Sequence, residues 1–189
     1  MPDLEDYQLI DLSEKYKDHI LHWRNSDHVR NSMFTDRLIT PEEHNRWFER
    51  VTQDKGFSNG IIAKVLLYKN QPIGFMNFTD IDGENSRCSW GFYIGEASAP
   101  KGSGQIMAFH SLNYIFGEYH LRKLCAEILD SNVRSLRYHQ KLGFVEEGRL
   151  KEHVFRQDHY ADVIIMALFR EQWAARQQEL LLEWKNKSL

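Results

Sequence analysis

The sequence has few cysteines and no long apolar run, and each shortage excludes a class of protein. Cys88 and Cys125 stand far apart inside apolar stretches, which predicts two buried free thiols in a reducing cytosol rather than a disulfide framework. The longest apolar run, residues 163–169, is too short to span a bilayer. The acidic N-terminus lacks the basic and apolar regions of a signal peptide. We therefore expect a cytoplasmic protein that does not bind a membrane.

Basic clusters and metal-binding spacings are also missing. The chain has 24 Lys and Arg against 27 Asp and Glu, a net charge of −3, and no long basic block, so we expect no nucleic-acid partner. Its nine histidines show neither His-x-His nor His-x-x-x-His spacing. Since the two cysteines also form no CxxC pair, we expect no metal.

What is present is typical of one folded domain. The chain has 189 residues, is 42% hydrophobic and contains five Trp and eleven Phe. We find no internal repeat and no long linker, which predicts a single domain over residues 1–189.

The apolar patterns predict a mixed α+β (α/β) fold. Thr40, Pro41 and Glu43 form a helix start, with Thr40 as the N-cap. Two short helices are expected within 14–34, and another helix follows the glycines near 103. Further helices are expected at 132–143 and from 170 onward. Strands are predicted at 7–12, 60–70, 71–82, 86–95, 123–129, 144–155 and 160–169.

A glycine turn precedes an apolar helix at residues 99–116. Gly102 and Gly104 flank Ser103 after Lys101, so unpaired N–H groups would gather at the positive end of the helix. That arrangement binds phosphate or pyrophosphate. The same turn is often purely structural, and it has neither the Walker nor the Rossmann spacing.

A second motif follows about thirty residues later, in "NVRSLRYHQKLGF" at 132–144. Together the two motifs resemble the GNAT superfamily of N-acetyltransferases, whose acetyl-CoA site combines a Q/R-x-x-G-x-G/A loop with an N-x-x-A/S…Y-x-K-x-G-F helix. The resemblance covers residues 7–173. Lys101 stands where the family has Arg or Gln, and Ile106 where it has a small residue. The implied fold is the GNAT fold, a central mixed, largely antiparallel sheet flanked by helices.

More narrowly, the chain resembles the UDP-4-amino-sugar N-acetyltransferases of pseudaminic acid biosynthesis. The resemblance lies in residues 21–36, 42–49, 72–82, 87–96, 120–129 and 146–173. It implies acetyl-CoA as donor and UDP-4-amino-4,6-dideoxy-N-acetyl-altrosamine as acceptor. Acetyltransferases of ribosomal-protein N-termini and of spermidine share the second motif and are the alternative. A third hypothesis is an acyl-CoA-binding protein that has lost catalysis.

The resemblance also implies how acetyl-CoA is held. Backbone N–H groups of the glycine turn would bind the pyrophosphate, a strand edge freed by a break in pairing would bind pantetheine, and Asn132 would bond the pantetheine arm. The implied cofactor-binding residues are Phe92, Tyr93, Ile94, Lys101, Gly102, Ser103, Gly104, Gln105, Ile106, Asn132, His139 and Lys141.

Acetyl transfer to an amine needs an oxyanion donor, an acid for the leaving thiolate and a base for the amine. A backbone N–H at residues 92–94 is the candidate oxyanion donor. The superfamily commonly places a tyrosine seven residues after the motif asparagine, where this chain has His139. Helix neighbours point about 100° apart, so His139 is the first candidate acid and Tyr138 the second. Glu127, in an apolar strand, is the candidate base acting through water, with an ordinary ion pair as its alternative.

The resembled family also suggests residues that contact the acceptor. Arg24, Met33 and Phe34 carry over as residues that border the nucleotide-sugar, and Tyr93 and Glu127 would lie by the sugar. His44 and Trp47 share a helix face and would cover the uracil or the sugar's methyl group. Each has a structural alternative: the aromatic rings as core, and Arg24 as an ion pair with Asp27 or Glu43.

The C-terminal segment carries more apolar residues than a surface helix needs. This excess predicts a homodimer contact through Trp173, Leu180, Leu181 and Trp184.

Overall fold

Seven strands in the described part of the chain form one sheet, in the order β1-β2-β3-β4-β5-β7-β6. The structure is a computed structural model that describes residues 3–53 and 60–186, so the outermost ends of the predicted 1–189 domain lie outside the described residues. The strands are β1 Tyr7–Asp11, β2 Ile62–Tyr68, β3 Gln71–Asp82, β4 Arg87–Ile94, β5 Lys123–Leu129, β6 Val145–Arg156 and β7 His159–Phe169.

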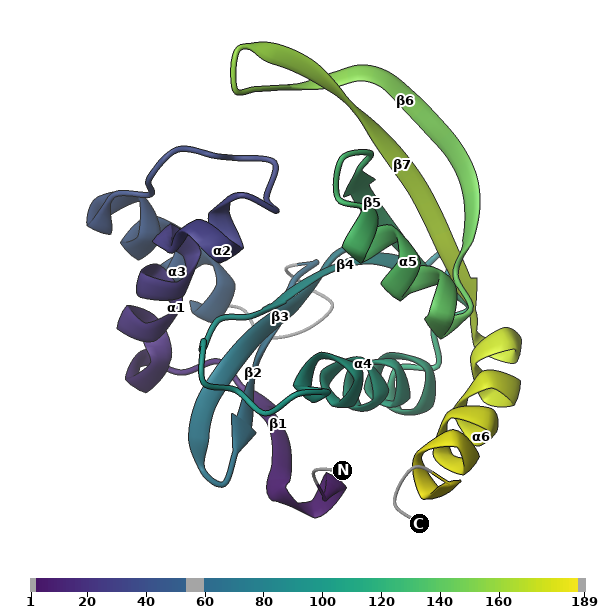
Figure 1. Ribbon diagram of the computed structural model, residues 1–189. Coiled ribbons are helices and arrows are strands. Elements are labelled where there is room, and N and C mark those ends of the chain that lie inside the picture. The colour runs from purple at the N-terminus through teal and green to yellow at the C-terminus, as the bar shows by residue number, and fades with distance from the viewer. Residues whose placement is uncertain (1–2, 54–59, 187–189) are drawn as a thin grey trace.

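Helices cover both faces of this sheet (Figure 1). The predicted start at Thr40 is confirmed, because Glu43 N–H donates to Thr40 Oγ1 (3.2 Å) and Thr40 N–H donates to Glu43 Oε2 (3.0 Å). The α-helices are α1 Lys17–Asn25, α2 Asp27–Arg30, α3 Pro41–Gln53, α4 Ser103–Asn113, α5 Val133–Leu142 and α6 Arg170–Asn186. Shorter helical turns are η1 Leu4–Asp6, η2 Glu14–Tyr16 and η4 Tyr114–Glu118.

All neighbouring strands are antiparallel except β4 and β5, which confirms the mixed, largely antiparallel α+β fold. Among the described residues, β4 and β5 pair only at Arg87–Lys123, Cys88–Leu124 and Ser89–Cys125. Beyond Ser89 the two strands diverge, while β4 stays paired with β3 as far as Ile94. The edge of β4 that faces β5 is therefore open, as the expected break in pairing requires.

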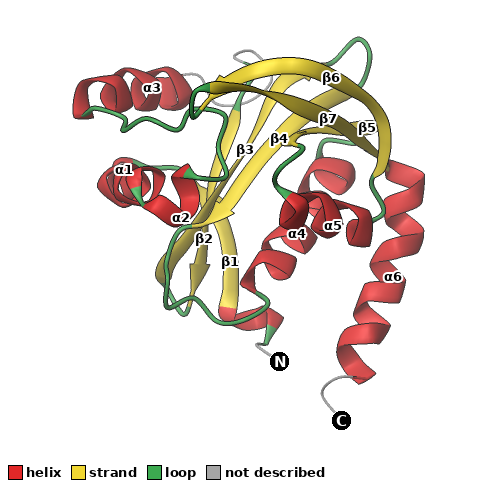
Figure 2. Cartoon of the chain, turned by 45° about the horizontal axis from the view of Figure 1, so that its top comes forward, coloured by secondary structure: helices red, strands yellow, loops and turns green. Residues whose placement is uncertain are grey.

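Helices α1 and α3 lie on one side of the sheet and α4 and α6 on the other (Figure 2). Strand alternation divides the core between these two faces. On one face, Val65 and Phe75 pack in a cluster with residues of α1 and α3. On the other face, Met76 and Phe78 pack with Met107 of α4 and with α6. The opening between β4 and β5 therefore lies between two separately packed layers.

Helix α6 buries its apolar residues within its own chain. Trp173, Leu180 and Trp184 are at most 7% exposed, and the Phe109 ring lies 5.3 Å from that of Trp184. Leu181 is partly buried against the same core. The structure therefore does not support a dimer contact through these residues, which pack within their own chain, and the homodimer itself stays a prediction.

The two cysteines are free thiols, as predicted, although Cys125 is only partly buried. Burial raises the pKa of Cys88 to about 12. None of the helices in residues 3–53 and 60–186 is both long and apolar enough to cross a membrane.

Candidate active site

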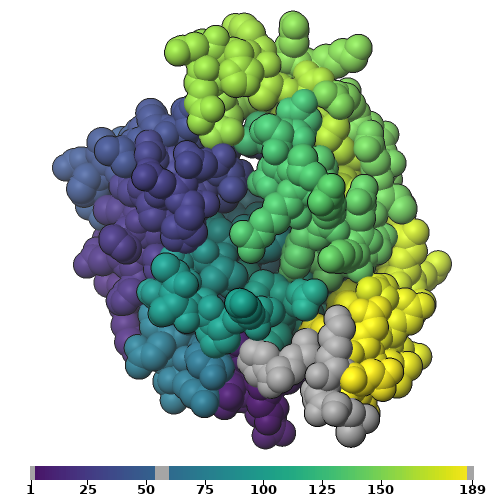
Figure 3. Space-filling model, in the orientation of Figure 1, coloured from purple at the N-terminus to yellow at the C-terminus, as the bar shows by residue number. Residues whose placement is uncertain are grey.

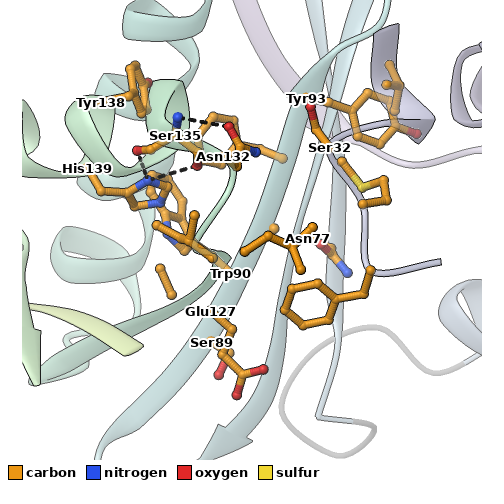
Figure 4. A pocket seen from close by; sticks show the side chains of 18 of the residues that line it. Ser32, Asn77, Ser89, Trp90, Tyr93, Glu127, Asn132, Ser135, Tyr138 and His139 are labelled. Atoms are coloured by element: carbon orange, nitrogen blue, oxygen red, sulfur yellow. Dashed lines mark hydrogen bonds between the residues drawn. The ribbon is translucent and has the colours of Figure 1, made fainter. Parts of the chain in front are cut away.

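A cleft of about 610 Å³ opens where β4 and β5 separate. Figure 4 shows its two sides: Asn132, Ser135, Tyr138 and His139 on the α5 side, and Ser32, Asn77 and Tyr93 on the other. The α5 side continues to Gly104 at the start of α4. The cleft therefore connects the glycine turn with the N-terminal helices.

The glycine turn offers fewer free N–H groups than its length suggests. Gly102 caps α4 with a φ of +95°, a conformation that favours glycine. Ser103 N–H donates to the Pro100 carbonyl, and the N–H groups of Gln105 and Ile106 donate to the Gly102 carbonyl. In the described part of the chain, the backbone donors left without a backbone partner in this turn are those of Lys101, Gly102 and Gly104.

Ser103 bonds within the chain at this turn. Its hydroxyl donates to the Pro100 carbonyl (2.7 Å) and lies 3.1 Å from the Tyr7 hydroxyl. At the start of α5, Asn132 Oδ1 accepts the Ser135 N–H at 3.1 Å and caps the helix. The Asn132 amide N–H groups are then left to face the cleft that this residue lines.

His139 is buried in the wall of the cleft, with 3% of its surface exposed. Its ring contacts those of Trp90 and Phe144 at 5.6 and 4.9 Å, and Nδ1 lies 2.8 Å from the Ser135 carbonyl oxygen. Nδ1 therefore carries the hydrogen and Nε2 a lone pair. Burial lowers the pKa of His139 to about 4, despite the opposing bond to the backbone.

Tyr138 and His139 both line the cleft, although they are helix neighbours. Their rings lie 5.8 Å apart at 82°, and the Phe92 ring contacts both, at 5.4 and 5.7 Å. The Tyr138 hydroxyl donates to the Gly104 carbonyl at 2.6 Å, and burial raises its pKa. The rotation between neighbouring helix positions therefore does not remove either residue from the cleft.

Arg24 lies in the opposite wall with Met33, Phe34 and Tyr93. Its Nη2 donates to the Thr35 carbonyl (3.2 Å), whereas Nη1 is buried without a hydrogen-bond partner. Burial lowers the pKa of Arg24.

The ion pairs weighed for Arg24 are absent from the described residues. Asp27 pairs with Arg30, and Glu43 pairs with Arg37. Arg24 therefore lines the cleft without a carboxylate partner among the described residues.

Glu127 also lines the cleft, but it is exposed rather than buried among apolar neighbours. Glu127 shares a sheet face with polar residues that were not predicted as site residues from the sequence. Thr79 pairs with Ser89 and Asn77 with Gly91, so Asn77, Thr79 and Ser89 point to one side. Alternation within each strand was a usable signal, but only the register between strands shows that these residues meet.

Eight predicted site residues do not line the cleft. Five of them belong to the glycine turn beside it: Lys101, Gly102, Ser103, Gln105 and Ile106, of which Ile106 is buried in the core. The other three are His44, Trp47 and Lys141. His44 is 4% exposed, donates from Nε2 to the Lys17 carbonyl (2.8 Å) and stacks on Trp47 at 5.1 Å. Trp47 packs on Phe75, so this pair belongs to the core beneath α3. Lys141 is exposed near the far end of α5, where its carbonyl accepts from Arg176.

Comparison with known proteins gives related sequences of limited coverage. An uncharacterized N-acetyltransferase of a Bacillus subtilis prophage, YokL, is 30% identical over 55% of this chain and 59% of its own length. The putative ribosomal N-acetyltransferase YdaF of the same species is 26% identical over 61% and 62%. Spermidine N(1)-acetyltransferase of Vibrio cholerae is 24% identical over 56% and 61%. The matched regions span about three fifths of these relatives.

A solved structure shares the fold. Spermidine N-acetyltransferase from Vibrio cholerae, in complex with CoA and spermine, superposes with a TM-score of 0.81 at 19% identity, covering 90% of this chain and 99% of that one. The family model of the acetyltransferase (GNAT) domain matches residues 8–145, well over half of the sequence. The chain therefore belongs to the GNAT acetyltransferase family.

Proposed function

We propose that the protein is an N-acetyltransferase that takes its acetyl group from acetyl-CoA. The free N–H groups of Lys101, Gly102 and Gly104 would bind the pyrophosphate, and the open edge of β4 and the Asn132 amide would bind pantetheine. Gly102 meets nothing within 4 Å of an added Cβ, which leaves room for a ligand at the turn. Membership of the GNAT family supports this assignment.

The cleft residues suggest how the transfer proceeds. A neutral amine attacks the thioester carbonyl, a C–N bond forms, and the C–S bond breaks to leave coenzyme A thiolate. Glu127, exposed in the cleft, takes the amine proton through water, while a backbone N–H of residues 92–94 stabilises the oxyanion. The thiolate then receives a proton from the α5 side.

We assign that acid to Tyr138 rather than to His139. With a pKa of about 4, His139 is mostly neutral at pH 7 with its hydrogen on Nδ1, so it is a poor proton donor from Nε2. The raised pKa of Tyr138 keeps its hydroxyl protonated, and the hydroxyl donates to the Gly104 carbonyl in the glycine turn. His139 supports the wall next to Phe92.

The proposed acceptor is a UDP-4-amino-sugar, UDP-4-amino-4,6-dideoxy-N-acetyl-altrosamine of pseudaminic acid biosynthesis. Arg24 carries this assignment: the residue lines the half of the cleft away from the glycine turn, and its Nη1 is buried without a hydrogen-bond partner. A buried guanidinium donor without a partner is costly, and the diphosphate of a nucleotide-sugar would satisfy it. Phe34 and Tyr93 add flat apolar surface for the nucleoside or sugar.

A polyamine or a protein N-terminus is the second candidate acceptor. Asp80 and Glu127 place two exposed carboxylates in the cleft, which would attract a cationic amine. The Arg24 guanidinium repels such a substrate.

The test is a panel of amines with acetyl-CoA, followed by thiol release: UDP-4-amino-sugars, spermidine and an N-terminal peptide. We expect turnover of the UDP-sugar. In Arg24→Gln its KM should rise at least about tenfold, the effect of losing a hydrogen bond to a charged group. UDP should raise the Tm of the native protein and not that of the variant.

Arg137→Gln is the matched control, because Arg137 is an exposed cation on α5 that does not line the cleft. Turnover of spermidine or peptide alone would contradict the nucleotide-sugar assignment and retain the acetyltransferase. Binding of coenzyme A without turnover of any amine would instead support a binding protein.

A further inference from the structure

The wall of the cleft opposite α5 is an irregular segment, residues 31–36, which we call the acceptor segment. It follows α2 and forms neither helix nor strand. Ser32, Met33, Phe34 and Thr35 all line the cleft. Backbone N–H groups at its start bond to carbonyls of α2, Ser32 to Val29 and Met33 to Arg30, and further bonds from other elements hold the rest of the segment.

Two of these bonds come from the N-terminal helices. Arg24 Nη2 donates to the Thr35 carbonyl, and Arg30 Nη1 donates to the Asp36 carbonyl (3.1 Å). Both hold the C-terminal half of the segment to α1 and α2.

The remaining bonds come from the tip of the β6–β7 hairpin, more than 120 residues away. Arg156 Nη2 donates to the Asn31 carbonyl at 3.2 Å, and Gln157 N–H donates to Asp36 Oδ2 at 3.1 Å. Figure 3 shows the yellow-green hairpin lying against the blue N-terminal part of the chain above a small opening. The hairpin thus bonds to both ends of the acceptor segment and bridges the cleft.

Phe34 connects the middle of the segment to the same hairpin. It packs against a small cluster formed by Leu129 of β5 and by Ala161 and Val163 of β7. Phe34 therefore both lines the cleft and contacts the hairpin.

Burying the Arg156 guanidinium in this position costs free energy of desolvation. It is 6% exposed, its Nε is buried without a partner, and no carboxylate among the described residues lies within salt-bridge distance of it. A buried cation without a carboxylate contributes little to stability compared with an apolar side chain. Its bond to Asn31 is therefore better explained by positioning than by stability.

We propose that Arg156 is a positioning residue for the acceptor: its bond to the Asn31 carbonyl holds the acceptor segment against the hairpin and keeps Met33, Phe34 and Thr35 in place in the cleft. The inference rests on the proposed function only in assigning this half of the cleft to the amine. Arg156 itself does not line the cleft.

The test compares Arg156→Gln, Arg156→Lys and the native chain with the UDP-4-amino-sugar, or with whichever amine of the panel is turned over. We expect Arg156→Gln to raise the KM of the amine about tenfold, the effect of one bond from a charged donor, with kcat and the KM of acetyl-CoA within about twofold. Arg156→Lys keeps a charged donor and should recover most of the loss. Lys151→Gln, an exposed cation on the same strand, is the matched control.

Hydrogen exchange of the amides in residues 31–36 gives a readout that needs no amine. It should quicken in Arg156→Gln, and similarly in Asp36→Ala, which removes the second bond from the hairpin without emptying a buried site. An unchanged amine KM, or equal losses with amine and acetyl-CoA, would overturn the proposal. If no amine is turned over, the proposed function fails, and unchanged exchange in both variants would separately overturn the positioning role.

Discussion

Burial shifts the pKa values of His139 and Tyr138, neighbours on α5, in opposite directions. Burial lowers the pKa of His139 to about 4, so at pH 7 only about one molecule in a thousand carries the imidazolium. Burial raises the pKa of Tyr138, so its hydroxyl stays protonated throughout the neutral range. At the level of single residues, the phenol is therefore the group with a proton to give.

Replacing each residue by phenylalanine separates the two roles. Tyr138→Phe should lower kcat about 100-fold, the usual contribution of a positioned acid. His139→Phe keeps a ring among Trp90 and Phe144 and should retain kcat within about fivefold. Steady-state rates from pH 5.5 to 8 check both variants.

The pH profile gives an independent sign. A catalytic imidazolium with a pKa of about 4 would make kcat fall tenfold per pH unit throughout that range, because its protonated fraction falls. We expect no such decline in the native protein. Finding it, together with loss of activity in His139→Phe, would return the acid to His139.

The spacing of the second motif was enough to locate this pair but not to assign its chemistry. Position seven after Asn132 marks the family's acid, and the structure puts His139 beside the cleft. The protonation state of His139 depends on burial against Trp90 of β4 and on the bond to the Ser135 carbonyl. Neither contact is visible in the order of residues.

At the level of elements, the turn that ends β4 packs closely against Trp23 of α1. Gly95 N–H donates to the Ile73 carbonyl at 2.9 Å, and a Cβ on Gly95 would lie 2.2 Å from Trp23 Cγ. Backbone and a buried indole therefore leave no room for any side chain.

Gly95→Ala should destabilise the protein by about 2 kcal/mol or more, because Trp23 or the end of β4 must move. Gly117→Ala is the matched control, since nothing lies within 4 Å of its added Cβ, and its effect should stay within about 1 kcal/mol. Urea unfolding measures both. Equal stability of the two variants would show that α1 shifts freely on the sheet.

The elements themselves were largely readable from the sequence, whereas their alignment was not. β-Branched and aromatic residues between turn segments predicted the strands that form β3 and β4. Asp80 has a φ of +52°, beside an irregularity in the β3–β4 register, and no propensity predicts that interruption. The polar row of Asn77, Thr79 and Ser89 therefore emerged only with the fold.

For the whole molecule, the C-terminal helix completes the core. Trp184 is 7% exposed against Phe109, whereas Leu182, two residues earlier, is 60% exposed. Trp184→Ala should cost about 3–5 kcal/mol and Leu182→Ala less than about 0.5 kcal/mol in free energy of unfolding. Chemical denaturation at two protein concentrations checks this, and a midpoint that rises with concentration would indicate that copies of the chain share this surface.

The sequence showed that α6 carries many apolar residues, but it did not show which surface they pack against. A second copy and the helix α4 would satisfy the same pattern equally well, because burial does not depend on which chain supplies the contact. His44 and Trp47 show the same ambiguity: a shared helix face can point to a ligand or to the core, and here α3 turns it toward Phe75. Pattern alone cannot separate these cases.

The divergence of β4 and β5 has a consequence for the order of events in turnover. The opening between β4 and β5 passes through the sheet. The glycine turn and α5 lie on one face of the sheet, and the acceptor segment lies on the other. Under the proposed function, neither substrate has to leave before the other arrives, and we expect both to bind at once and the acetyl group to pass directly between them. Initial-velocity lines for the two substrates should therefore intersect rather than run parallel.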